Sequence, residues 1–534
     1  MKKILLCVLV SVTCTTIHAQ VLDQYIKGHF NGSFESYTQN YFKDEKIGAD
    51  KPLDNVSSNN FLKLDYVYGK FSAGIQMESY LPPLLGFFPI PVNNQTKIVN
   101  KYFKFTDEHF SVQVGDFYEQ FGSGLIFRAL ENRQIGINNA LEGFNVHVSP
   151  TKFLKIKTIY GRTRKIFDYT NTVTRGIDAD LDINKLIAPK NTAAPIQLNL
   201  GGSYVGKYQE YAGGLNDFPS TVHAYAGRFD LTAGDFAMDA EYVDKGADPN
   251  ILNNFSFDRG KAFLLNLSYT KNNFGFTGTY RSLYNMNFLS EREMEFASVA
   301  PVNFIPALTK QHDYLTSNIY VYAAQNKGES GFQTDIFYHC EPGSLFGGKY
   351  GTKIAFNTSV FGGLKDSANI FGGTGEQYFT DINLEIKKKL SKKFELTIGL
   401  QKLFYNATAI QAVSEGKVNA YVTAIGGLYK FAPKKSIRFK VEHLQTANDK
   451  GSWASAVTEF SFASPYAFFI SDLFNYGSTK NHYYNFGASV TRKATRFSLS
   501  YGKQRAGLFC VGGVCRFVPA SYGFTASLTT NFSN

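Results

Sequence analysis

The sequence predicts an all-β protein in the form of a single transmembrane antiparallel β-barrel. Three observations carry this prediction: apolar and polar residues alternate along many segments, tight turns alternate with long connections, and aromatic residues are abundant, with 49 Phe and 33 Tyr among 534 residues. Only 19% of the residues are charged, which excludes a disordered chain. No apolar run reaches the roughly 20 residues that a membrane-spanning helix needs, so a bundle of membrane helices is excluded as well.

The first residues have the pattern of a secretory signal peptide. Two lysines precede the apolar stretch 4–12, and a small residue precedes Gln20 at an acceptable cleavage site. We therefore expect a signal peptide over residues 1–19 and a barrel over residues 20–534. Because few residues separate Gln20 from the first strand-like segment, we expect no N-terminal plug domain.

Strand-like alternation is clearest in the C-terminal half. Residues 394–401 place Phe, Leu, Ile and Leu on one face and Glu, Thr, Gly and Gln on the other. The segments 62–66, 382–387 and 437–442 divide in the same way. Alternation alone fits both a soluble sandwich and a membrane barrel. Segments of about ten residues, joined alternately by short and long connections, favour an outer-membrane barrel with short periplasmic turns and long extracellular loops.

The rhythm of turns and loops sets the expected number of strands. Tight turns are predicted at 69–70, 106–109, 149–152, 232–235, 271–273, 432–435 and 491–494. Long connections are predicted at 39–59, 81–96, 119–140, 163–196, 285–314 and 363–376. This alternation predicts about 22 to 24 strands, within a range of roughly 14 to 26. The segments 197–206 and 352–361 break it: the count is about 24 if both are wall strands and about 22 if both lie in loops. The last strand, within 521–534, is expected to pair with the first, near 25–37, and to close the barrel.

The sequence contains no catalytic or cofactor-binding signature. The GxSxG, HExxH, Walker and paired CxxC motifs are absent, so we predict a non-enzymatic protein without a cofactor or a metal. Cys510 and Cys515 flank a Gly-Gly pair. In an oxidising periplasm, a hairpin disulfide between them is favoured over two free thiols or half of a metal site. Cys340 is left over as a small buried or lumen-facing residue.

The segment 115–133 has the features of a loop that folds into the lumen. It leaves a strand through a Gly-rich bend and then carries Arg128, Glu131 and Arg133. In porins, such a loop sets the size and charge of the pore, so these residues are candidates for a lumen constriction whose arginines select anions. The alternative is a surface loop whose charges pair with each other or with the lumen wall.

A second segment, 81–91, is almost wholly apolar although the predicted topology places it among the extracellular loops. Exposed apolar segments mark contacts with partners or membranes, which makes this segment a candidate partner-docking loop. A loop that caps the barrel and packs on itself is the alternative. The candidate docking residues are Leu84, Leu85, Phe87, Phe88 and Ile90.

The excess of basic residues is modest, with 55 Lys and Arg against 44 Asp and Glu. Lysines and arginines at the rim would neutralise lipopolysaccharide phosphates. We therefore expect contacts with outer-membrane lipid, lipopolysaccharide and other envelope proteins, and none with nucleic acid.

The segments 115–133, 305–312 and 346–352 resemble recurring blocks of an uncharacterised family of Bacteroidota outer-membrane β-barrels. The resemblance covers essentially the whole mature chain and implies a location in the outer membrane. It implies no established activity and no functional residues. Bacteroidota outer membranes also contain multi-subunit machines for protein assembly and secretion, some of which have accessory barrels.

Two functions of different class therefore stay open. The first is an accessory or scaffolding subunit of a multi-protein outer-membrane complex, indicated by the apolar loop and by the absence of plug, receptor and catalytic modules. The second is a passive, porin-like channel for small solutes, indicated by the charged inward faces and the candidate constriction.

Overall fold

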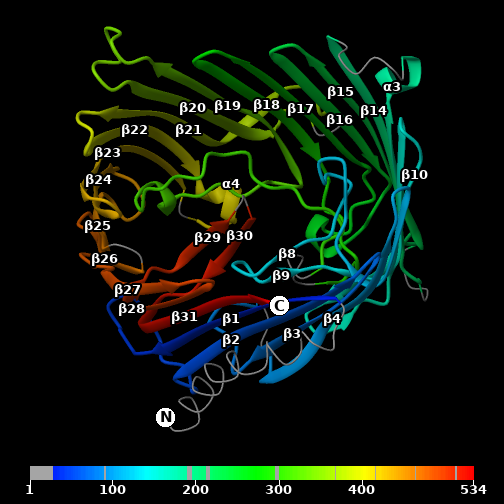
Figure 1. The fold of residues 1–534 in the computed structure, drawn as a ribbon, viewed down its shortest axis with the longest axis horizontal. Coiled ribbons are helices and arrows are strands. Elements are labelled where there is room, and N and C mark those ends of the chain that lie inside the picture. The colour runs from blue at the N-terminus through cyan, green and yellow to red at the C-terminus, as the bar shows by residue number, and fades with distance from the viewer. Residues whose placement is uncertain are drawn as a thin grey trace.

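The computed structural model describes residues 28–88, 92–188, 195–211, 217–294, 300–366, 369–414, 416–462, 465–511 and 514–534. Figure 1 looks into a closed ring of strands, with several connections folded into its interior. In these residues, 24 antiparallel strands form the wall, and each pairs with its neighbours on both sides. The prediction of an all-β barrel is confirmed.

The wall strands are β1 (His29–Tyr41), β2 (Val56–Tyr68), β3 (Phe71–Tyr80), β4 (Gln95–Thr106), β5 (Phe110–Phe117), β10 (Leu141–Thr151), β11 (Leu154–Lys165), β13 (Val173–Asp182), β14 (Ile196–Tyr208), β15 (Thr221–Ala233), β16 (Phe236–Lys245), β17 (Gly260–Lys271), β18 (Phe274–Tyr284), β19 (Gly328–Cys340), β20 (Thr352–Leu364), β21 (Thr374–Lys389), β22 (Phe394–Asn406), β23 (Lys417–Ala432), β24 (Lys435–Gln445), β25 (Trp453–Phe462), β26 (Tyr466–Asn475), β27 (Asn485–Arg492), β28 (Thr495–Gln504) and β31 (Ser521–Ser533).

Short elements lie in the connections. They are β6 (Gln120–Phe121), β7 (Phe127–Arg128), β8 (Glu131–Asn132), β9 (Ile137–Asn138), β12 (Asp168–Tyr169), β29 (Gly507–Val511), β30 (Val514–Val518), α3 (Ile183–Ile187), α4 (Ala407–Gln411) and the 3-10 turns η1 (Ile251–Asn253) and η2 (Ser317–Ile319). No helix in the described residues is both long and apolar enough to cross a membrane.

The first and last strands close the barrel. β31 pairs antiparallel with β1, and Ser36 stands opposite Leu528 in this register. The predicted tight turns also form, such as the one at 69–70 between β2 and β3. Both segments that break the rhythm, 197–206 and 352–361, are wall strands, β14 and β20. The higher of the two expected strand counts is therefore correct.

The prediction of one long connection over 163–196 is wrong. β13 lies within this range and pairs with β11 and β14. Its outward face carries Arg175, Ile177 and Ala179 instead of an unbroken apolar row. Its inward face carries Asp178, whose carboxylate lies 2.7 Å from the Arg228 guanidinium. Because both faces contain charges, the apolar alternation that marks the other strands is missing here.

The outer face of the wall is apolar, as the alternation predicts. Exposed side chains on this face include Ile398 and Leu400 of β22 and Val441 of β24. In the same part of the wall, Gln401 of β22 and Glu442 of β24 point inward and are buried. Because a lipid-facing surface must be apolar while a lumen tolerates polar groups, this division fits a membrane barrel.

Candidate functional site

Several long connections on one side of the barrel, the loop side, fold into the lumen. We call the described parts of the segments 81–88, 118–140, 285–327 and 505–520 the collar. Figure 1 shows the cyan segment that contains β8 and β9, the green segment that precedes β19 and the red hairpin of β29 and β30, all inside the ring of wall strands. These segments line the lumen, so they are the candidate functional site.

Hydrogen bonds join the segment 118–140 to the segment 285–327. The Arg128 amide donates to the Val302 carbonyl over 3.0 Å. The Asn303 side-chain amide donates to the Leu125 carbonyl, also over 3.0 Å. The segment 285–327 is in turn joined to 505–520, because the Arg505 guanidinium donates to the Ile319 carbonyl over 3.4 Å.

Two further contacts complete the ring. The Arg516 guanidinium donates to the Gly86 carbonyl over 2.8 Å, which joins 505–520 to 81–88. Gly136 of the segment 118–140 has a φ of +71°, and a Cβ at this position would lie 2.7 Å from the Phe87 carbonyl oxygen. Glycine is therefore needed here both for its backbone conformation and for this close approach. The four segments form a closed ring inside the wall.

The first half of the segment 118–140 is anchored by apolar contacts. Phe121, Leu125, Ile126 and Phe127 are all buried. They belong to one buried apolar cluster with inward-facing residues of β14 to β18 and with part of the segment 285–327. The wall residues of this cluster include Val205, Val222, Ala224, Val243, Ala262, Leu264 and Leu283. Burial of this apolar surface holds the loop against the wall.

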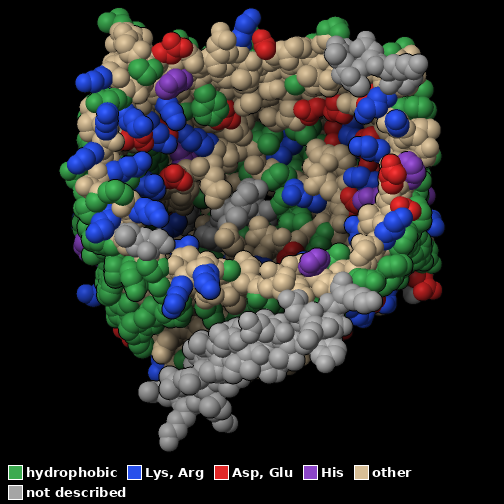
Figure 2. Space-filling model, in the orientation of Figure 1, with side chains coloured by type: hydrophobic (Ala, Val, Ile, Leu, Met, Phe, Trp, Pro, Cys, Tyr) green, Lys and Arg blue, Asp and Glu red, His purple; other side chains and the backbone are tan. Residues whose placement is uncertain are grey.

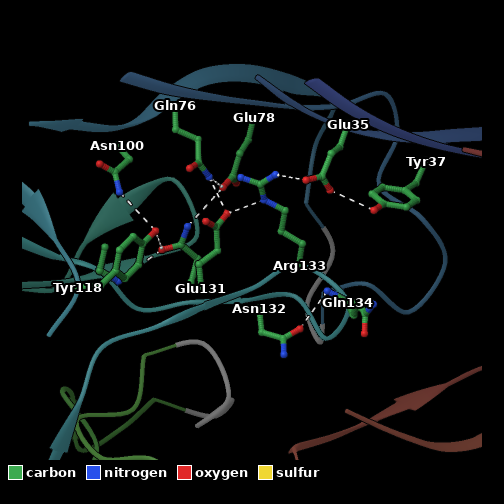
Figure 3. A network of polar contacts seen from close by, with 12 residues as sticks. Glu35, Tyr37, Gln76, Glu78, Asn100, Tyr118, Glu131, Asn132, Arg133 and Gln134 are labelled. Atoms are coloured by element: carbon green, nitrogen blue, oxygen red, sulfur yellow. Dashed lines mark hydrogen bonds and ion pairs between the residues drawn. The ribbon is translucent and has the colours of Figure 1, made fainter. Parts of the chain in front are cut away.

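The second half of the same segment is anchored by the polar network in Figure 3. The Arg133 guanidinium pairs with Glu35 of β1 and with Glu131, in each case over 2.8 Å. Glu131 also accepts a hydrogen bond of 2.7 Å from the Gln76 side-chain amide of β3. The polar half therefore connects three segments of the chain through one arginine and two carboxylates.

A buried ion pair lies next to this network. The Arg164 guanidinium of β11 donates to the Glu78 carboxylate of β3 over 2.7 Å, and the two side chains are only 3% and 4% exposed. The Tyr80 hydroxyl donates to the same carboxylate over 2.8 Å. Because both charges are out of water, removal of one of them leaves the other uncompensated.

Glu119 attaches the start of the segment 118–140 to the wall. Its carboxylate lies 2.5 Å from His147 Nε2 and 3.3 Å from Lys157 Nζ. Burial opposes ionisation of Glu119, but the hydrogen bonds from His147 and from the Gln120 amide outweigh it and lower the pKa of Glu119 to about 2.

The later part of the segment 285–327 lies along the inner face of β21 to β24. The Tyr314 hydroxyl donates to Glu385 over 2.9 Å, and the Thr316 amide donates to Glu442 over 2.9 Å. Further along the chain, Tyr322 packs in an apolar cluster under the same part of the wall. The segment therefore follows the wall over several strands and is held there by both polar and apolar contacts.

A cavity of about 340 Å³ lies in the lumen beside the collar. We call it the vestibule. Its charged lining residues are Lys353, Lys387, Arg438, Lys440, Asp313, Glu385 and Glu395. Lys387 pairs with Glu385 over 2.8 Å, so the lining contains both signs of charge. Figure 2 shows a hollow in the middle of this view, with Lys and Arg side chains gathered beside it over β22 to β26. Among the described residues, no group of three His, Cys, Asp or Glu side chains is arranged to hold a metal ion.

The three candidate constriction residues all lie in the collar. Glu131 and Arg133 pair with each other, and Arg133 also pairs with Glu35 of the wall strand β1. This is the pairing expected in the alternative interpretation, in which the charges of the loop bind each other or the lumen wall. Arg128 differs from them, because its guanidinium lies 4.9 Å from the centre of the Phe304 ring and has no carboxylate partner among the described residues. A role of these residues in setting the pore stays a prediction.

The candidate docking loop packs inward. Phe87 is 6% exposed and contacts the ring of Tyr80, as does Phe88. Leu84 packs in the same cluster, while Leu85 donates its amide to the Tyr41 hydroxyl over 2.9 Å. Ile90 lies outside the described residues. Docking by this loop stays a prediction.

The cysteines have different positions. Cys510 and Cys515 stand opposite each other in the backbone register of β29 and β30. Their side chains lie outside the described residues, so the disulfide stays a prediction. Cys340 is a free, buried thiol at the end of β19.

Sequence reasoning did not place 285–327 and 505–520 in the lumen. One signal was present in the sequence: Val222, Ala224 and Ala226 of β15 face inward, whereas the inward positions of a strand such as β24 carry Arg438, Lys440 and Glu442. An apolar inward face in a large barrel indicates that another segment covers it.

A family model matches residues 1–532 of the chain. The chain belongs to DUF6029, a family of unknown function. No curated protein matches this DUF6029 member significantly.

Solved structures with a similar fold are outer-membrane barrels. The P pilus usher (PapC) translocation pore matches with a TM-score of 0.46 and 8% identity, over 94% of this chain and 99% of that chain. An E. coli P pilus tip assembly intermediate, PapC-PapD-PapK-PapG, matches with a TM-score of 0.50 and 8% identity, over 95% of this chain and 61% of that chain. OccD1 (OprD) matches with a TM-score of 0.34 and 11% identity, over 95% and 96%. At these identities, the likeness concerns the fold alone.

Proposed function

We propose that this protein is an outer-membrane channel for small solutes whose lumen is narrowed by the collar. The observation that carries the proposal is the collar itself, since four long connections fold inward and are fastened to the wall and to one another. A barrel of this strand number encloses a wide lumen, and loops that line it set the size of the pore. In this proposal, residues 1–19 are a cleaved signal peptide, and basic residues at the rim contact lipopolysaccharide.

Two features support a channel over a scaffold. The vestibule is lined by charged side chains of both signs, as expected for a water-filled path through the lumen. The apolar loop 81–88 buries Phe87 against Tyr80, so its main aromatic side chain is used within the barrel.

The test is single-channel recording from the purified, refolded protein in a planar lipid bilayer. Resolved current steps that grow with salt concentration are expected. A variant without residues 507–518 keeps the wall register, in which Gln504 stands opposite Ser521. Because it lacks β29 and β30, its conductance is expected to exceed that of the parent protein. A bilayer that stays silent with protein shown to be folded would contradict the channel.

An accessory-subunit function has one specific observation in its favour. Leu345 and Phe346, in the connection between β19 and β20, are 90% and 70% exposed. Exposed apolar pairs of this kind mark contact sites. Affinity purification of the tagged protein from its native membrane tests this function. Recovery of another envelope protein in fixed ratio, lost in the Leu345→Ser/Phe346→Ser variant and kept in an Ile187→Ser control, would support it.

A further inference from the structure

We infer that the collar selects anionic solutes, and that Arg128, Arg505 and Arg516, three arginines with no carboxylate in an ion pair among the described residues, carry this selectivity. The inference rests on the proposed channel function and names the class of solute: small ions that bear a carboxylate or a phosphate group, which a planar guanidinium binds through two parallel hydrogen bonds.

Arg128 keeps its polar edge available for a solute. Its guanidinium stacks 4.9 Å from the centre of the Phe304 ring, and the position of its backbone is fixed by the bond from its amide to the Val302 carbonyl. Stacking occupies the face of a guanidinium and leaves the N–H groups at its edge free to donate. Arg128 is only partly buried, so a solute in the lumen has access to it.

Arg505 and Arg516 place two more positive charges in the collar, in the segment 505–520. Arg505 donates to the Ile319 carbonyl over 3.4 Å. Arg516 donates to the Gly86 carbonyl and stacks 5.4 Å from the centre of the Phe87 ring. The Nε of Arg516 is buried and has no hydrogen-bond partner among the described residues. The segment 505–520 contains these two arginines and no Asp or Glu.

Three carboxylates near the collar are already engaged in anchoring it. Glu131 is paired with Arg133, and Glu119 is bound by His147 and Lys157. Glu442 is 1% exposed and accepts from the Thr316 amide and hydroxyl. Arg128, Arg505 and Arg516 have no carboxylate in an ion pair among the described residues, whereas the exposed carboxylate of Asp313 lines the vestibule.

Burial strengthens the attraction for an anion. It lowers the pKa of Arg128, Arg505 and Arg516, because each guanidinium loses water; at Arg505 this loss outweighs the opposing attraction of Asp449. A carboxylate or phosphate that passes through the collar supplies the missing counter-charge. The vestibule does not select in this way, since its lining contains lysines, an arginine and carboxylates together.

The reversal potential of the full-length protein in a planar bilayer, measured across a tenfold KCl gradient, tests the inference. The parent channel is expected to prefer chloride over potassium. Each single Arg→Gln change at 128, 505 or 516 is expected to lower the chloride preference about twofold, because a unit charge in water acts on an ion roughly 8 Å away with an energy close to RT. The triple variant is expected to lose the preference.

Two controls separate charge from structure. Arg162→Gln removes the same charge from β11 on the outer side of the wall, next to the exposed Tyr160, and is expected to leave selectivity unchanged. The triple Arg→Lys variant keeps the charges and is expected to retain the preference. An open channel that prefers potassium, or one whose chloride preference survives the triple Gln change, overturns the inference. Absence of any conductance overturns the channel proposal itself, and this inference with it.

Discussion

The two halves of the segment 118–140 are held to the same wall by different forces. Residues 121–127 are anchored by buried apolar side chains, whereas residues 131–138 are anchored by Arg133, Glu131 and their polar partners. Apolar anchoring is insensitive to charge, while the polar network depends on ionisation and on screening by salt. One loop is therefore attached at residues 121–127 by contacts that salt and pH leave unchanged, and at residues 131–138 by contacts that both weaken.

The largest expected effect comes from the buried ion pair beside the polar half. Arg164→Leu leaves the Glu78 carboxylate buried without its counter-charge, which is expected to cost about 3 to 5 kcal/mol of unfolding free energy. The urea midpoint of unfolding in detergent measures the loss. The double variant Glu78→Gln/Arg164→Leu is expected to recover part of it. Equal stability of the single variant and the parent would show that the pair does not hold the polar half.

The apolar half is tested by Leu125→Ala. This change removes buried methyl groups and leaves a cavity against the wall. It is expected to lower the free energy of unfolding by about 3 kcal/mol. Hydrogen exchange is expected to accelerate in residues 121–129 and to stay unchanged in 131–138. Faster exchange along the whole segment would mean that the two halves detach as one unit.

A smaller effect is expected from Arg133→Gln, because this arginine is still 17% exposed. Loss of its two ion pairs is expected to lower the free energy of unfolding by about 1 to 2 kcal/mol. In the parent protein, 1 M salt is expected to speed exchange in 131–138 and to leave 121–127 unaffected. A salt effect of the same size in both halves would remove the distinction between them.

The smallest expected effect is the loss of stability when Glu119 is protonated in acid. Because the pKa of Glu119 is lowered to about 2 from 4.5, its ionised form stabilises the folded state above about pH 4.5, and this contribution is lost as the pH falls toward 2. Exchange of the amides around residue 119 is expected to accelerate over that range. In Glu119→Gln this acceleration is expected to be absent, and its persistence would assign the pH dependence to another group.

Much of the fold follows from the sequence because a lipid-facing wall imposes one pattern on every strand. Ile398 and Leu400 face lipid, and their polar neighbours face the lumen, so strand and register are readable locally. The pattern failed at β13, where Arg175 interrupts the outer face and Asp178 occupies the inner one.

The collar was only partly predictable. The charges of Arg128, Glu131 and Arg133 pointed to a loop in the lumen, but their partners did not follow from local sequence. Glu35 lies 98 positions from Arg133, and a contact at that separation depends on how the wall closes. Arg505 and Arg516 were overlooked because nothing in their own segment shows which side of the wall it occupies.

The contact between Arg516 and Gly86 also carries information about the order of assembly. These residues are 430 positions apart, and a free chain loses considerable entropy when it brings such distant positions together. Pairing of β31 with β1 removes most of that cost, since it places the two segments at neighbouring positions on a rigid ring. The contact between Arg516 and Gly86 is therefore expected to form only once β31 has closed the wall against β1.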